Sequence, residues 1–292
     1  MTAPIAALAE IAGRYDVLFC DLWGCLHDGR NPFPAAVAAL QGFRAGGGTV
    51  VLLTNSPKPR RGVEAQLDRM GVPRDCWDTI ATSGDAARAA MFRGAVGRRV
   101  WHIGEPHDLS FFEPLAVLDT PLAIERVGRD EAEGIVCTGP FDPHADPEVM
   151  RPEFALARDR RLKLLCANPD IVVDRGETRE WCAGALARLY AEMGGESLYF
   201  GKPHPPIYDL ARLRLAALGC ETDPARILCV GDGIHTDVQG ALGEDLDSLF
   251  LTGGLAAAET GTGPDSAHDP ARLAAFLAEA RLSPTWVMGH LA

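Results

Sequence analysis

The sequence has too few basic residues for a protein that binds nucleic acid or an anionic membrane surface. It holds 28 lysines and arginines against 40 aspartates and glutamates, which gives a formal net charge of −12. Such a charge repels phosphate backbones and anionic lipid head groups. It does not exclude a small anionic substrate, because one metal ion and one lysine can reverse the sign of the charge locally. We therefore expect no nucleic-acid partner.

The sequence also lacks long apolar runs and closely spaced cysteines. No apolar run approaches the length that spans a membrane, so we expect no membrane partner. The eight cysteines show no short paired spacing and no Cys/His cluster, which argues against a zinc site. Residues 1–14 lack the basic region and the apolar core of a signal peptide. These features predict a cytoplasmic protein with reduced thiols.

Strand and helix patterns alternate along the whole chain. Strands are expected at 17–22, 49–53, 79–83, 99–103, 134–138, 162–167, 198–200, 226–230 and 248–251. This alternation predicts parallel sheets with helices on both faces. The pattern restarts near residue 86 and resumes near residue 182. We therefore predict an α/β fold in which a doubly wound parallel-sheet core, residues 1–85 and 182–292, carries an inserted α/β domain at 86–181.

The stretch from Val17 to Gly29 is the most informative part of the sequence. An apolar, strand-forming run leads to Asp21 and breaks at Gly24 before a polar His-Asp-Gly turn. A run of this kind is typical of a buried parallel strand, whose carboxyl end faces the ligand crevice of an open α/β sheet. A carboxylate at that end is costly to bury unless a metal ion or hydrogen bonds compensate its charge. Taken alone, Asp21 fits equally well as a helix cap or a turn residue.

Three further predicted strands end in polar residues. These are Thr54-Asn55-Ser56, Lys202 in a Gly-Lys-Pro loop, and Asp232 in a Gly-Asp-Gly turn followed by Asp237. In a parallel sheet such ends lie on one edge, so they would surround one crevice. Asp21 and Asp232 could share a hard cation such as Mg²⁺, which prefers oxygen ligands. Thr54 or Ser56 could hold a phosphate with Lys202. Asp21 could then attack phosphorus, because carboxylates are established nucleophiles in this chemistry.

The order and spacing of these residues resemble those of the haloacid dehalogenase (HAD) superfamily of phosphotransferases, over nearly the whole chain. Ala167-Asn168-Pro169-Asp170 and Gly184-Ala185-Leu186, which precede Gly201-Lys202-Pro203, resemble the corresponding parts of the class IIA capped phosphatases. That class includes sugar-phosphate, nucleotide and nitrophenyl phosphatases. The resemblance implies a HAD-like, Rossmann-like core with a mobile cap that closes over the site.

The resemblance also implies a metal site. Asp21 would be the nucleophile and would bind Mg²⁺ together with the backbone carbonyl of Trp23 and the carboxylate of Asp232. Asp237 would stand behind these ligands without touching the metal ion. Mg²⁺ is therefore the expected cofactor.

The remaining implied roles concern the substrate. Lys202 would act in catalysis by steadying the charge of the phosphoryl group. Asn168 and Asp170, late in the cap, are the predicted contacts to the rest of the substrate. Three residues would hold the phosphoryl group: Thr54, Asn55 and Ser56. We expect a small phosphorylated molecule as the partner, and a homodimer is a candidate assembly.

Trp23 departs from the pattern of the superfamily. Its phosphatases typically carry a second aspartate two residues after the nucleophile, which protonates the leaving group and then activates water. An indole does neither, whereas the backbone carbonyl of Trp23 is unaffected. His27 and Asp28 are candidate replacements, although a turn hydrogen bond is the more ordinary role of each. Cys25 beside them is read as a packed thiol.

Two hypotheses about function follow. The first is a Mg²⁺-dependent phosphatase of a small phosphorylated metabolite, such as a sugar phosphate or a nucleotide, acting through an aspartyl phosphate on Asp21. The second is a phosphometabolite-binding or regulatory protein whose catalysis is degraded because Trp23 replaces the general acid and base. Turnover of phosphate esters distinguishes the two.

Overall fold

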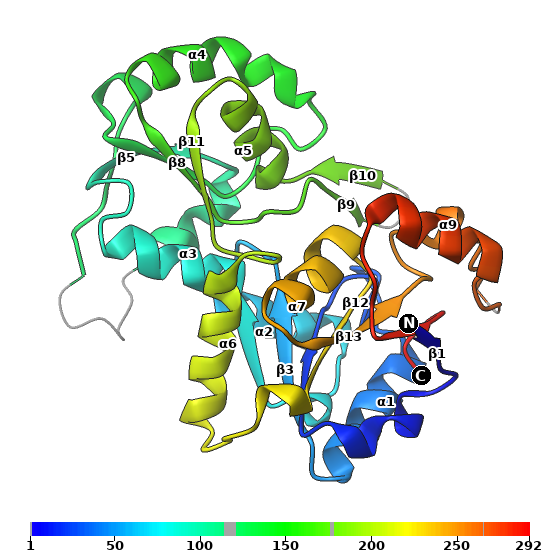
Figure 1. The fold of residues 1–292 in the computed structure, drawn as a ribbon. Coiled ribbons are helices and arrows are strands. Elements are labelled where there is room, and N and C mark those ends of the chain that lie inside the picture. The colour runs from blue at the N-terminus through cyan, green and yellow to red at the C-terminus, as the bar shows by residue number, and fades with distance from the viewer. Residues whose placement is uncertain (1, 114–120, 176–177, 265) are drawn as a thin grey trace. The chain divides into compact units, whose positions relative to one another are not determined.

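The computed structural model describes residues 2–113, 121–175, 178–264 and 266–292. The chain divides into two compact units. Unit 1 comprises the chain up to Thr54 together with Ala65–Ala81 and Lys202–Ala292, and unit 2 comprises Asn55–Glu64 and Thr82–Gly201. Each unit has its own parallel sheet, which can be followed in Figure 1. Among the described residues, no helix is long and apolar enough to span a bilayer.

Unit 1 is built on a seven-stranded sheet in the order β1-β14-β13-β12-β2-β3-β4. The strands are β1 Ala3–Pro4, β2 Val17–Cys20, β3 Thr49–Thr54, β4 Thr79–Thr82, β12 Ile227–Gly231, β13 Asp247–Leu251 and β14 Trp286–Met288. The pairings from β1 across to β3 are all parallel. The chain therefore winds outward from the centre of the sheet in both directions, as the doubly wound prediction requires.

Helices cover the sheet of unit 1. They are α1 Pro34–Ala45, α6 Pro205–Ala217, α7 Gln239–Gly243, α8 Ala257–Thr260 and α9 Pro270–Ala280, with α2 Arg60–Met70 divided between the units. Val17 and Phe19 of β2 pack in one apolar cluster with Ile207 of α6. The alternate residues Leu18 and Cys20 are buried as well. Both faces of β2 are thus covered, which explains its continuous apolar run.

Unit 2 contains a five-stranded sheet and a hairpin. The sheet order is β11-β8-β7-β5-β6, with β5 Arg99–Ile103, β6 Glu125–Arg126, β7 Gly134–Cys137, β8 Lys163–Cys166 and β11 Glu196–Tyr199, all paired in parallel. The antiparallel pair is β9 Val172–Arg175 with β10 Thr178–Trp181. The helices are α3 Ser83–Phe92, α4 Arg151–Asp159 and α5 Ala183–Glu192.

Unit 2 has an apolar core on each face of its sheet. Ile135 of β7 packs in one cluster with Phe154 of α4 and Leu186 of α5. Its neighbour Val136 belongs to a second cluster with Met91 of α3. Because successive residues of a strand point to opposite faces, helices cover both sides of this sheet too.

Residues 182–201 lie in unit 2, although the sequence pattern places them with the core. This stretch contains α5, and the strand predicted at 198–200 is β11, which pairs with β8 in the second sheet. A strand that alternates with helices has the same sequence pattern in either parallel sheet. The pattern therefore could not show which of the two sheets β11 joins. The role of unit 2 as a cap stays a prediction.

Candidate active site

Asp21 stands at the topological switch point of the unit 1 sheet. β2 and β12 are neighbours, and the strand order runs from β2 to β3 on one side and from β12 to β13 on the other. The backbone N–H of Asp21 donates to the carbonyl of Val230 in β12 at 2.8 Å, which extends the pairing one residue beyond β2. Asp232 follows β12 directly. Ligands of open α/β sheets bind at such a point.

Lys202 forms two buried ion pairs. Its Nζ lies 2.8 Å from Oδ1 of Asp21 and 2.7 Å from Oδ1 of Asp237, and its side chain is 3% exposed. Burial lowers the pKa of Lys202, but the two carboxylates outweigh burial and leave this pKa well above its ordinary value. The ammonium group therefore stays charged and bridges the two carboxylates.

Asp237 lies in a short π-helix, Ile234–Val238, a type of turn that is frequent at functional sites. Its Oδ2 accepts the backbone N–H of Gly233 at 3.1 Å, while Oδ1 accepts from Lys202. A Cβ at Gly231 would lie 2.0 Å from Cγ of Asp237, so this carboxylate needs a glycine beside it. Asp237 therefore holds Lys202 from a fixed position.

Asp232 is enclosed by backbone. Its Oδ2 accepts the N–H of Leu255 at 2.9 Å. A Cβ would lie 2.1 Å from this oxygen if placed on Gly24 and 1.9 Å if placed on Gly254. Two glycines thus let the backbone approach the carboxylate from two loops. Gly254 and Leu255 lie far from Asp232 in the sequence and form no local motif with it. The sequence pattern therefore did not identify them as part of the site.

The site concentrates negative charge around one lysine. The carboxylates of Asp21, Asp232 and Asp237 all lie close enough to the ammonium group of Lys202 to interact with its charge. Burial, together with the neighbouring carboxylates, raises the pKa of Asp232 well above its usual value. Burial also raises the pKa of Asp237, against the effect of Lys202. Buried negative charge of this kind favours a bound cation.

Replacing Lys202 by methionine should destabilise unit 1. The substitution removes the counter-charge of two buried carboxylates, and breaking a buried ion pair from one side costs about 3–5 kcal/mol. We expect a fall of this size in the free energy of unfolding, measured by urea denaturation at neutral pH. Arg226→Met is the matched control, because Arg226 pairs with Asp16 at an exposed site and exposed pairs contribute about 1 kcal/mol or less. Equal losses in the two variants would contradict this assignment.

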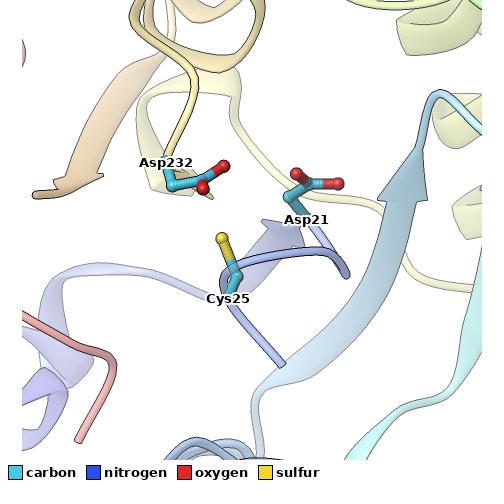
Figure 2. Close-up of side chains that lie close together, drawn as sticks. All are labelled: Asp21, Cys25 and Asp232. Carbon is cyan, nitrogen blue, oxygen red and sulfur yellow. The ribbon is translucent and has the colours of Figure 1, made fainter. Parts of the chain in front are cut away.

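The residues present fit a magnesium ion. Figure 2 shows the carboxylates of Asp21 and Asp232 beside the thiol of Cys25. A carboxylate oxygen of each aspartate and Sγ of Cys25 all lie within 4.8 Å of one another. Two carboxylates at the end of adjacent strands are hard oxygen ligands of the kind that Mg²⁺ prefers. Cys25, which the sequence pattern treats as a packed thiol, belongs to the same group.

The side chain of Trp23 packs within its own loop. Its ring meets that of His27 edge-on, with centroids 5.3 Å apart. A Cβ at Gly29 would lie 2.3 Å from Cζ2 of the indole, so the ring needs a glycine beneath it. Gly24, whose φ is 73°, turns the chain and donates its N–H to the carbonyl of His27 at 2.9 Å. Trp23 is thus a structural part of the loop that carries Cys25.

His27 and Asp28 both make turn hydrogen bonds. Nδ1 of His27 accepts the N–H of Gly29 at 3.0 Å, and the residue is 1% exposed. Oδ1 of Asp28 accepts the N–H groups of Arg30 and Asn31, at 2.8 and 2.6 Å. Several hydrogen bonds lower the pKa of Asp28, and the one from the backbone N–H of Asn31 has the largest effect. Neither side chain is therefore a ready replacement for the missing acid.

The buried His27 should make stability depend on pH. Burial lowers the pKa of His27 to about 4 in the folded protein, against 6.5 for an ordinary histidine. Between these values the unfolded chain binds more protons, so the contribution is full above pH 6.5 and is lost as the pH falls toward 4. We expect wild type to lose about 2 kcal/mol more than His27→Asn when the pH falls from about 7.5 to about 5. Asparagine keeps an acceptor for Gly29. Parallel urea unfolding curves at both pH values measure the difference, and identical losses would refute it.

The other predicted site residues divide between the units. Thr54 is the last residue of β3 and is buried in unit 1. Asn55 donates from Nδ2 to Oδ1 of Asp170 at 2.8 Å within unit 2, and the N–H of Asp170 donates to Oδ1 of Asn168 at 3.0 Å. Oγ of Ser56 accepts the N–H of Lys58 at 3.3 Å. The structure thus brings Asn55, Asn168 and Asp170 together, and their contacts to a substrate stay a prediction.

Comparison with known proteins identifies relatives over nearly the whole chain. A family model described as haloacid dehalogenase-like hydrolase matches residues 18–116, and a HAD-hydrolase-like model matches residues 199–280. The crystal structure of a hydrolase of the haloacid dehalogenase-like family from Brucella suis 1330 is 41% identical. It matches 99% of this chain and 100% of that chain, with a TM-score of 0.85.

Two further matches concern Mycobacterium tuberculosis. A D-glycerol 3-phosphate phosphatase of that organism is 27% identical over an alignment of 291 residues, and the match covers 97% of this chain and 71% of that protein. The crystal structure of a glycerol phosphate phosphatase from the same organism, in complex with magnesium, is 24% identical. It covers 96% of this chain and 76% of that chain, with a TM-score of 0.66, which supports the fold.

Proposed function

Because the chain belongs to the haloacid dehalogenase-like hydrolases, we propose that it is a Mg²⁺-dependent phosphatase of a small phosphorylated metabolite. The observation that supports this most directly is the placement of Asp21. It stands at the sheet's switch point, 2.8 Å from a buried ammonium group and beside the carboxylate of Asp232. The residues that we propose as nucleophile, counter-charge and metal ligand are thus close together.

Each of three side chains would have a separate role in the reaction. Asp21 would attack phosphorus with one carboxylate oxygen, and the bond from phosphorus to the ester oxygen would break, that oxygen taking a proton from water to become the alcohol. A second water molecule would then attack the aspartyl phosphate, which releases inorganic phosphate and regenerates the carboxylate. Lys202 would hold Oδ1 of Asp21 in place and offset charge on the phosphoryl oxygens. Asp237 would keep Lys202 charged and oriented.

The metal ion would be held by Asp21, Asp232 and the backbone carbonyl of Trp23. When bound, Mg²⁺ supplies Lewis-acid polarisation of the phosphoryl oxygens and offsets carboxylate charge. The amide of Leu255 would fix the orientation of Asp232 by holding its Oδ2. We assign the binding of the phosphoryl group to Thr54, which belongs to unit 1, and to the next two residues of the chain, Asn55 and Ser56.

A panel of phosphate esters tests this function. Sugar phosphates, D-glycerol 3-phosphate, nucleoside monophosphates and 4-nitrophenyl phosphate would be incubated with the protein in Mg²⁺ and in excess chelator, and inorganic phosphate would be measured. We expect release of phosphate from at least one ester, and we expect the chelator to stop it. D-Glycerol 3-phosphate is included because the mycobacterial relative is named for it.

A second function is favoured by one observation, the indole of Trp23 in the loop after the nucleophile. A protein without the acid and base could bind phosphorylated metabolites as a regulatory or carrier protein. Saturable binding of an ester in calorimetry, with no phosphate released from any member of the panel over a long incubation, would support this function against the phosphatase.

A further inference from the structure

Cys25 is an unusual neighbour for a magnesium site. Its thiol lies within 4.8 Å of carboxylate oxygens of both Asp21 and Asp232, and Figure 2 shows the sulfur directed toward the carboxylate of Asp232. Mg²⁺ gains little from sulfur, because it is a hard cation that prefers oxygen. The position of Cys25 is therefore not explained by the magnesium ion alone.

The thiol is buried and has no hydrogen-bond partner among the residues that the structure describes. Cys25 is 1% exposed. Three other buried cysteines do have such a partner: Sγ of Cys20 donates to the carbonyl of Asp21, Sγ of Cys76 to that of Pro73, and Sγ of Cys166 to that of Asn168. Cys25 instead presents its sulfur to two carboxylates.

We propose that Asp21, Cys25 and Asp232 form a binding site for thiophilic divalent cations of the Zn²⁺ and Cd²⁺ class. Such ions combine thiolate and carboxylate ligands, with metal–sulfur and metal–oxygen bonds of about 2.3 and 2.1 Å. Ligand atoms around a tetrahedral ion of this size stand about 3.5 Å apart. The three ligand atoms lie within 4.8 Å of one another, so they reach this spacing with a contraction of at most about 1.3 Å. All three side chains belong to unit 1.

Binding exchanges a proton for the metal ion. The Cys25 thiol loses its proton to the solvent as the metal–sulfur bond forms, so the cation binds with the release of one proton and without any oxidation. The bound ion also holds the carboxylate of Asp21. If the proposed phosphatase function holds, a thiophilic cation is therefore a reversible inhibitor that competes with Mg²⁺ for the same carboxylates.

Cadmium absorption tests the proposal without any use of activity. Cd²⁺ would be titrated into the reduced protein, and the ultraviolet sulfur-to-cadmium charge-transfer band would be measured. We expect a band that saturates at one equivalent, that is lost in Cys25→Ser and in Cys25→Ala, and that persists in Cys220→Ser. Cys220 is the matched control, because it is a free cysteine that is half-buried outside the site. No band in wild type, or equal bands in all variants, would overturn the proposal.

Two further cadmium titrations test the metal site independently of the proposed phosphatase function. Asp232→Asn should weaken Cd²⁺ binding at least about tenfold, and excess Mg²⁺ should diminish the band in wild type. A band unaffected by either would show that the thiol binds cadmium without the carboxylates and would overturn the site. These spectra are informative even if no ester is hydrolysed. Conversely, turnover that needs Mg²⁺ in a protein without the band would retain the phosphatase and reject the thiophilic site.

Discussion

Asp21→Asn should fold as wild type does and release no measurable phosphate from any ester that the wild type hydrolyses. An amide oxygen at this position is not a competent nucleophile, and losing the nucleophile of a covalent mechanism costs on the order of 10⁴-fold or more in rate. The fold should survive because asparagine has nearly the same shape as aspartate. Lys202 also keeps its contact with Asp237, 2.7 Å away. Phosphate release and urea unfolding would be measured on the same preparations.

The matched control for this variant is Asp16→Asn. Asp16 also pairs with a cation, Arg226, but on the exposed surface and away from the switch point. We expect it to keep wild-type activity. Acid quenching during turnover should trap a phosphorylated protein in wild type and none in Asp21→Asn. Turnover by Asp21→Asn at a rate near that of wild type would show that another residue attacks phosphorus.

Trp23→Asp should raise the rate on esters with poor leaving groups by about 10²–10⁴-fold, the usual contribution of general acid–base catalysis. Nitrophenolate leaves without a proton, so 4-nitrophenyl phosphate should gain far less than a sugar phosphate. In wild type the second step also lacks a base, and the phosphorylated form of Asp21 should therefore accumulate. The measurement is the ratio of the rate on the sugar phosphate to the rate on 4-nitrophenyl phosphate in each variant. This ratio does not depend on the fraction of active protein in a preparation.

Trp23→Ala is the size control for this experiment. The indole packs against His27 and over Gly29, so removing it will cost stability in both variants. Unfolding curves for both must accompany the kinetics. If Trp23→Asp and Trp23→Ala change all esters by the same factor, the missing acid does not limit the rate. Asp28→Asn would then be the next variant, although the hydrogen bonds of Asp28 to Arg30 and Asn31 oppose that role.

The residues that follow β2 and β12 could be predicted because each strand carries its own signal. A buried parallel strand appears in the sequence as an apolar run, and the first polar residue after the run lies at the carboxyl edge of the sheet. This logic alone places Asp21 and Asp232 at one edge, and in the structure each directly follows one of two adjacent strands. Lys202 joins them through its ion pair with Asp21.

Other parts of the site depend on contacts that no local pattern encodes. Leu255 and Gly254 approach Asp232 from a loop more than twenty residues away in sequence, and a backbone amide leaves no residue signature. The sequence predicts a packed thiol at Cys25 because burial is the ordinary state of a free cysteine. Cys25 is indeed buried, but its carboxylate neighbours follow separate strands and leave no local signal. The strand β11 was assigned to the wrong sheet for a similar reason, because pairing with β8 is a long-range choice.

The hydrogen bond from Leu255 to Asp232 gives the protein an internal spectroscopic probe. The amide proton of Leu255 points at one oxygen of a carboxylate that is 4% exposed. Its nuclear magnetic resonance frequency therefore responds to the charge on Asp232, and so to a proton or a cation on the carboxylate. A single labelled leucine amide can thus be used to follow occupancy of the site in the unmodified chain, with no substrate and no chromophore added.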